Sequence, residues 1–166
     1  MEEWMIVDGY NVIGACDAWS GLSLEESRDR LIMLLSEYQF TFNRRVILVF
    51  DAHRTPGAGT RLSDQGLTVI FTKEHETADQ MIERLVKQKK VTGRRIYVVT
   101  SDYLEQRMVF GQGAYRISSR ELFEEFARMK GEIAQKIEET KINKWRLHQG
   151  LEGDVLKRLE NWRRKK

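Results

Sequence analysis

Three aspartates, Asp8, Asp51 and Asp102, each come within two residues of the end of a short apolar segment rich in β-branched residues. Such segments are typical of buried strands. In an open parallel sheet, ligands bind outside the carboxyl ends of the strands. We therefore expect these three carboxylates to meet at one edge of a sheet. Asp79 lies in the predicted first turn of a helix that follows another strand at the same edge, and it adds a fourth carboxylate.

A group of carboxylates at one edge predicts a metal site. Each aspartate alone has an ordinary explanation, because aspartate is common in turns and at helix N-termini. Together they are costly, since two carboxylates about 5 Å apart repel by roughly 3 kcal/mol at an effective dielectric near 20. Oxygen ligands without cysteine or clustered histidine favour Mg²⁺, with Mn²⁺ as a second choice, over Zn²⁺. Mg²⁺ held by few carboxylates recruits phosphate oxygens, so the pattern predicts phosphodiester chemistry with one or two ions.

Two neutral polar residues, Asn11 and Ser101, accompany the aspartates. Residues 8–11, Asp-Gly-Tyr-Asn, predict a turn after the first strand. An amide or hydroxyl there can hydrogen-bond a phosphate oxygen, although turn formation or capping explains either residue equally well. The sequence has no Walker-type glycine loop, no Gly-x-Ser-x-Gly elbow and no Cys/His pair at zinc spacing.

The elements that must position these residues alternate between strand and helix patterns. Apolar runs predict strands at residues 4–7, 45–50, 67–71 and 95–100, and helical spacing predicts helices at 24–40 and 77–90. This alternation indicates βαβ units and therefore an α/β fold with a mainly parallel sheet.

Beyond residue 101, the pattern predicts a third helix over 102–111, a short strand over 115–117 and a long fourth helix capped by Ser118 or Ser119. The fourth helix carries an apolar stripe that we expect to pack on the sheet or on a neighbouring helix; the stripe consists of Leu122, Phe126, Met129, Ile133 and Ile137. Residues 53–66 predict a long loop, for which a functional lid and disorder are both open interpretations.

Length and charge favour one domain with a polyanionic partner. We expect a single domain over residues 1–166, with a helical, basic C-terminal extension from about residue 119. The net charge is only +3, but residues 128–166 carry twelve Lys/Arg against six Asp/Glu. Such an asymmetry favours nucleic acid, although basic ends also occur simply as solvated tails.

The sequence predicts a cytoplasmic protein without membrane contact. The first residues lack the basic and apolar regions of a signal peptide, and no apolar run approaches the roughly 20 residues that span a bilayer. Cys16 is the only cysteine, so no internal disulfide can form.

Four ordered motifs resemble the NYN-domain family, in particular its bacterial YacP-like branch. They are Val-Asp-Gly-Tyr-Asn at 7–11, Val-Phe-Asp-Ala-His at 49–53, the segment 71–79 and Thr-Ser-Asp at 100–102. The resemblance covers essentially the whole chain. It implies a PIN-like three-layer fold, with a central sheet flanked by helices, and a ribosome-associated, Mg²⁺-dependent endoribonuclease that acts in mRNA decay.

The resemblance also assigns roles to individual residues. It implies that Asp8, Asp79 and Asp102 bind the metal and that Asn11 and Ser101 support them. Asp51 matches the family's second-strand aspartate, for which direct and water-mediated metal contact are both open.

The leading hypothesis is therefore an endoribonuclease that cuts mRNA on the translating ribosome, with a monomer as the favoured state. The candidate RNA contacts are Lys73, Lys87, Lys90, Arg94, Arg163 and Arg164. A second hypothesis is a ribosome- or RNA-binding factor that keeps the fold without cleaving. A phosphatase or receiver-like protein with a nucleophilic aspartate is a third, disfavoured because the carboxylates come from several elements.

Overall fold

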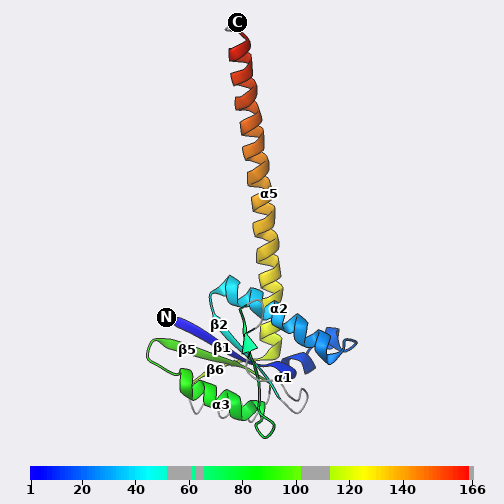
Figure 1. Cartoon of the computed structure of the whole chain (residues 1–166), viewed down its shortest axis with the longest axis vertical. Helices are drawn as coiled ribbons and strands as arrows, with labels where there is room; N and C mark the ends of the chain where they lie inside the picture. The colour runs from blue at the N-terminus through cyan, green and yellow to red at the C-terminus, as the bar shows by residue number, and fades with distance from the viewer. Residues whose placement is uncertain (52–60, 63–65, 102–112, 165–166) are drawn as a thin grey trace. The chain divides into compact units, whose positions relative to one another are not determined.

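The computed structural model describes residues 1–51, 61–62, 66–101 and 113–164 (Figure 1). The strands are β1 (Glu2–Asp8), β2 (Arg45–Phe50), β3 (Arg61–Leu62), β4 (Thr68–Phe71), β5 (Arg94–Val99) and β6 (Tyr115–Ile117). They form one sheet in the order β3-β4-β2-β1-β5-β6. All neighbours pair in parallel except β3, which runs antiparallel to β4. The predicted α/β class and mainly parallel sheet are confirmed.

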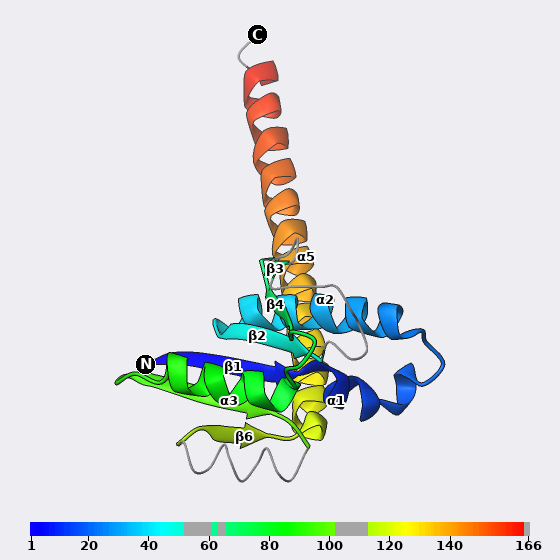
Figure 2. The same ribbon diagram turned by 60° about the horizontal axis from the view of Figure 1, so that its bottom comes forward.

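Helices cover both faces of the sheet. They are α1 (Gly9–Gly14), a 3₁₀ helix (Asp17–Trp19), α2 (Leu24–Phe42), α3 (Ala78–Lys89) and α5 (Ser119–Arg164). Figures 1 and 2 show α3 on one face of β1 and β2 and α2 on the other. The apolar residues of one side of α2 and of α3 are buried. Because both faces of the central strands are covered, residues 4–8 of β1 are all buried.

The first turns of α5 are fixed by a polar network. The Tyr38 hydroxyl of α2 donates to the Glu125 carboxylate and accepts from Arg44, which also pairs with Glu3 of β1 at 2.6 Å. Burial and the neighbouring Glu125 carboxylate raise the pKa of Tyr38 well above its ordinary value, so the hydroxyl remains a donor. The network ties the start of α5 to α2 and β1.

Several local predictions need correction. The segment after β1 forms the short helix α1 rather than a simple turn, and residues 61–62, predicted as loop, form β3. In the stripe of α5, the first three residues are buried, but Ile137 is 50% exposed, so the stripe does not continue as a packing face. The side chain of Ile133 and the predicted helix 102–111 lie outside the described residues.

The chain divides into two compact units, residues 1–126 and 127–166, with the boundary inside α5. The expectation of one domain with a helical extension stays a prediction. Within the part of the chain that the structure describes, no helix is long and apolar enough to cross a membrane.

Candidate functional site

A pocket of about 640 Å³ lies at the carboxyl edge of the sheet. Its walls include five of the residues singled out in the sequence, Asp8, Asn11, Asp51, Asp79 and Ser101. The predicted carboxylate Asp102 lies outside the described residues. The structure therefore brings together three of the four predicted carboxylates and both neutral polar partners.

Strand order explains why residues distant in sequence meet. β1 lies between β2 and β5, and all three run in the same direction. Asp8 is the last residue of β1 and lies opposite Val49 of β2, so Asp51 follows one residue after the end of that neighbouring strand. Ser101 comes two residues after β5 on the other side. Parallel strands thus place three chain segments at one edge.

Asp79 enters from α3, and its carboxylate is not needed to cap that helix. Thr77 is the N-cap: its Oγ1 accepts from the Gln80 backbone N–H at 3.2 Å, and the Gln80 side chain accepts from the Thr77 N–H at 3.0 Å. This reciprocal pair satisfies two helix-end donors. Asp79 lies in the first turn of α3, as predicted, where a carboxylate favours a helix N-terminus, and its side chain also lines the pocket.

Asp8 is the most buried carboxylate of the pocket, with 9% of the residue exposed. It is the N-cap residue of α1, yet its side chain makes no capping hydrogen bond. A carboxylate at this depth requires hydrogen bonds or a nearby cation to offset its desolvation. Both the position and the charge of the Asp8 carboxylate suit it to bind a cation in the pocket.

The amide of Asn11 has a fixed orientation. Its Oδ1 accepts from the Ser101 backbone N–H at 2.8 Å and from the Ser101 hydroxyl at 2.7 Å. Because a backbone N–H can only donate, the atom facing it must be the amide oxygen. The amide nitrogen is then left as a donor, and no described residue accepts a hydrogen bond from it.

Ser119 joins this cluster and was missed in the sequence analysis, which considered it only as a helix cap. Its hydroxyl donates to Asn11 Oδ1 at 3.4 Å, and the residue is 2% exposed. The cap of α5 is instead Ser118, which exchanges hydrogen bonds with Glu121. A serine pair before a helix signals capping, but sequence gives no sign that the second serine reaches a residue in α1.

Gly9 and Tyr10 hold α1 against the sheet. A Cβ on Gly9 would lie 2.3 Å from the Phe50 ring, so only glycine permits this approach. The Tyr10 ring packs on the same phenylalanine with centroids 4.9 Å apart, and its hydroxyl accepts from Arg28 at 3.1 Å. These contacts fix the position of α1, so that Asn11, the residue after Tyr10, lies at the pocket wall.

The pocket offers carboxylate oxygens, which are the donor type that Mg²⁺ and Mn²⁺ take. Among the residues with described positions, no group of three or more His, Cys, Asp or Glu side chains is arranged to hold a metal. Mg²⁺ commonly binds through one or two carboxylates and keeps several waters. Oxygen-only donors at one sheet edge are compatible with that mode, whereas zinc prefers nitrogen or sulfur ligands.

Four of the predicted RNA contacts line two different pockets. Lys73 and Lys87 line a pocket beside α3, whereas Lys90 and Arg94 line another at the amino end of β5. Arg94 pairs with Glu2 at 2.9 Å and lies 4.6 Å from the Trp4 ring centroid, so it has a structural role.

Two further contacts were predicted in the C-terminal unit. Arg163 is exposed there, and the side chain of Arg164 lies outside the described set. Trp145 in the same unit is 60% exposed.

A parallel sheet covered by helices, with carboxylates, an amide and a serine outside its carboxyl ends, is the arrangement of a PIN-like, nuclease-like protein. The chain belongs to the family of YacP-like NYN domains, whose model matches residues 5–164. Membership gives the protein a nuclease-like, RNA-related function. The family resemblance found in the sequence is thereby confirmed.

Two relatives from Bacillus subtilis support the assignment. The uncharacterized protein YacP is 43% identical over 163 residues, which cover 96% of each chain. The crystal structure of Rae1 (YacP) matches with a TM-score of 0.75 and 42% identity, covering 96% of this chain and 94% of that one. A tryptophan-to-leucine mutant of Rae1 gives the same TM-score and identity over 85% of this chain and 84% of its own.

Proposed function

We propose that this protein is a metal-dependent endoribonuclease that hydrolyses phosphodiester bonds of RNA in the cytoplasm, with mRNA on the translating ribosome as its substrate. The observation that carries the proposal is the meeting of three aspartates with the oriented Asn11 amide in one pocket. Carboxylates that recruit Mg²⁺ beside a free amide donor suit a substrate that is itself an anion.

Each pocket residue has a role that follows from its chemistry. Asp8 and Asp79 hold the ion, with Asp102 as the third ligand that the family resemblance implies, and Asp51 contacts it directly or through water. When bound, Mg²⁺ supplies charge neutralisation at the phosphate and a lower pKa for the attacking water. Mn²⁺ can take the same place.

The Asn11 amide nitrogen donates to a non-bridging phosphate oxygen. It does so without losing rotational freedom on binding, because Ser101 already fixes the opposite end of the amide. The protein's own contribution is therefore a rigid anionic pocket with one pre-aimed neutral donor.

The test is cleavage of RNA by purified protein with and without Mg²⁺, together with mapping of mRNA ends in translating extracts. Asp8→Asn should lower cleavage by at least about a hundredfold while RNA binding is retained, which is the scale expected for loss of electrostatic stabilisation at a reacting centre. Asp29→Asn is the matched control, because this aspartate is exposed on α2.

The remaining outcomes separate the alternatives. Unchanged cleavage in Asp8→Asn would remove this residue from the metal site. Binding of RNA or ribosomes without cleavage under any metal condition would identify a non-catalytic binding factor instead. Equal cutting of free and translating mRNA would contradict the ribosomal part of the proposal alone.

A further inference from the structure

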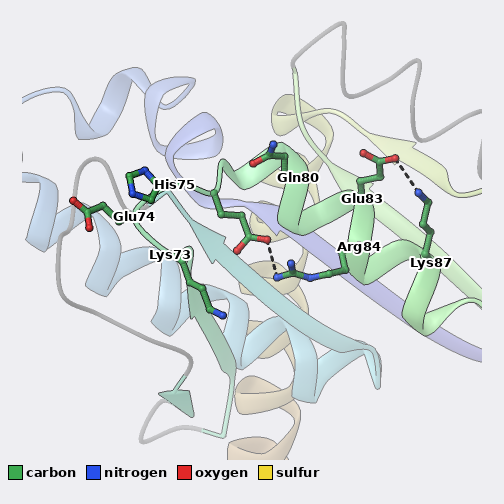
Figure 3. A pocket seen from close by; sticks show the side chains of 8 residues that line it. Lys73, Glu74, His75, Gln80, Glu83, Arg84 and Lys87 are labelled. Atoms are coloured by element: carbon green, nitrogen blue, oxygen red, sulfur yellow. Dashed lines mark hydrogen bonds and ion pairs between the residues drawn. The ribbon is translucent and has the colours of Figure 1, made fainter.

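A second pocket, of about 710 Å³, lies beside the acidic one. Figure 3 shows its side chains coming from two segments: Lys73, Glu74 and His75 follow β4, and Gln80, Glu83, Arg84 and Lys87 belong to α3. Glu76 completes the lining. Its volume falls within the range of roughly 300–1,000 Å³ typical of small-ligand sites.

The two pockets share one short stretch of chain. Thr77, Ala78 and Asp79 line the acidic pocket, while Glu76 and Gln80, directly before and after them, line the second. Neighbouring Cα atoms lie about 3.8 Å apart, so the Cα of Glu76 is at most about 11 Å from that of Asp79, and a group bound at Glu76 is close to a phosphate bound at Asp79.

The charges of the second pocket are balanced, which argues against a simple phosphate site. Arg84 pairs with Glu76 at 2.7 Å, and Lys87 pairs with Glu83 at 3.2 Å. Lys73 has no ion pair among the residues that the structure describes, and the lining includes a third carboxylate, Glu74. A phosphate-binding site normally concentrates positive charge without matching carboxylates.

Glu76 presents an acceptor that lacks a donor. Its side chain is 12% exposed, and one carboxylate oxygen, Oε1, is bound by Arg84. The other, Oε2, is buried and has no hydrogen-bond partner among the described residues. A buried carboxylate oxygen without a donor is unfavourable unless a ligand supplies the N–H.

The lining of the same pocket also carries hydrogen-bond donors. Gln80 uses its side-chain oxygen for capping, so its amide nitrogen remains as a donor. The guanidinium of Arg84 is held in place by Glu76 and lies 3.3 Å from the sulfur of Met81, leaving other N–H groups for a ligand. Combined donors and an acceptor at fixed positions complement the edge of a nucleobase, which presents N–H groups beside carbonyl or ring-nitrogen acceptors.

We propose that this pocket binds one nucleobase of the substrate RNA, one or two nucleotides from the cleaved phosphate, with the Glu76 carboxylate accepting a base N–H. The inference rests on the proposed function for its biological role but not for its test. It makes Glu76, Gln80 and Arg84 determinants of cleavage sequence.

The first experiment is binding and needs no cleavage. Each of the four nucleoside monophosphates is titrated into the full chain, and separately inorganic phosphate, while the backbone amides of residues 73–87 are followed by NMR. At least one nucleotide should shift these amides where phosphate does not. Glu76→Gln should raise the Kd for that nucleotide by about tenfold, which is the scale of one lost base contact. Glu124→Gln, an exposed ion-paired glutamate of α5, should have no effect.

The second experiment is cleavage of RNA randomised around the cut. Wild-type protein should prefer one base at a single flanking position, and Glu76→Gln should lose that preference while still cutting. Lys73→Ala, which removes an exposed side chain and so leaves folding intact, should weaken cleavage of all sequences equally.

The outcomes distinguish this inference from the proposed function. Amide shifts reproduced by phosphate alone, or a base preference untouched by Glu76→Gln in a protein that cuts RNA, would overturn the base pocket and leave the nuclease proposal standing. Nucleotide-specific shifts in a protein that never cleaves RNA would overturn the nuclease proposal and leave the base pocket standing.

Discussion

At the scale of single residues, the orientation of one amide decides what the acidic pocket can offer a substrate. Asn11 could present either an oxygen or a nitrogen, and these have opposite hydrogen-bonding character. The backbone N–H of Ser101 fixes the amide oxygen toward Ser101, and the hydroxyls of Ser101 and Ser119 donate to the same oxygen. The pocket therefore combines negative carboxylates with one neutral donor.

Removing the Ser119 hydroxyl should test this clamp. Ser119→Ala is expected to lower kcat by about threefold to tenfold with little change in KM, because a looser amide is less well aligned in the transition state. Ser27→Ala is the matched control, since Ser27 is equally buried at 2% exposure but lies on α2. Equal loss of activity in both variants would show that only packing is involved.

The contact of Gly9 with the sheet leads to a stability prediction. Gly9→Ala places a methyl group against the Phe50 ring and should lower the free energy of unfolding by about 1–3 kcal/mol. Gly14→Ala, at the other end of α1, meets nothing within 4 Å and should be neutral or stabilising by up to about 1 kcal/mol. Urea denaturation of both variants measures the difference. Equal stabilities would contradict the close approach.

Removal of one carboxylate should change how metal affects stability. Without metal, Asp8→Asn should melt at the same temperature as wild type or higher, because repulsion within the pocket is relieved. Mg²⁺ at about a hundred times its Kd should stabilise the wild type by about 2.7 kcal/mol and the variant by much less. Differential scanning calorimetry with and without Mg²⁺ checks both. Destabilisation of the metal-free variant would indicate a structural hydrogen bond at Asp8.

At the scale of elements, α3 matters most, because its first turn separates the two pockets. The capping box of Thr77 and Gln80 sets the helix start and leaves Asp79 available. α2 begins with the same capping box, formed by Ser23 and Glu26, but neither residue lines one of these two pockets. The chain thus contains an internal control for the effect of capping.

Thr77→Ala and Ser23→Ala should each cost about 0.5–2 kcal/mol of stability, because each removes an N-cap acceptor. Only Thr77→Ala should also lower RNA cleavage, since fraying of α3 displaces Asp79. Denaturation curves and cleavage rates on the same two proteins provide the comparison. A cleavage loss in Ser23→Ala of the same size would mean that global stability, not the position of Asp79, limits activity.

At the scale of the whole molecule, the two compact units carry opposite net charge. Residues 127–166 hold twelve Lys/Arg and six Asp/Glu, which leaves sixteen Lys/Arg against nineteen Asp/Glu in residues 1–126. The unit with the acidic pocket is therefore negative overall, and the C-terminal unit is positive. Attraction of a polyanion falls mainly to the C-terminal unit.

Neutralising the four C-terminal cations, by replacing residues 163–166 with alanine, should weaken RNA binding and its dependence on salt. Each lost phosphate contact lowers the slope of log K against log salt by about 0.7 for single-stranded RNA, so the four together give up to about 3. Fluorescence anisotropy of a short RNA bound to the Asp8→Asn background measures this slope. An unchanged slope would exclude the tail from RNA binding.

Much of the fold was predictable because its signals are local. Apolar runs located four strands to within a few residues, and helical spacing located α2 and α3. The short helix α1 and strand β3 were missed, since each is too brief for periodicity to appear. Local pattern also overestimated the packing stripe of α5, because spacing shows that a face is apolar but not that a partner covers it.

What the sequence by itself determined was the chemistry available: strand-end carboxylates, an adjacent amide and a serine, in the order typical of one family. Only the tertiary structure decided which of these groups meet. Ser119 reaches Asn11 across 108 residues of sequence, and Glu76 is left with an unsatisfied buried oxygen. Such contacts depend on how distant elements pack against one another. Local sequence patterns do not reveal that packing, because it is decided by interactions across the whole folded chain.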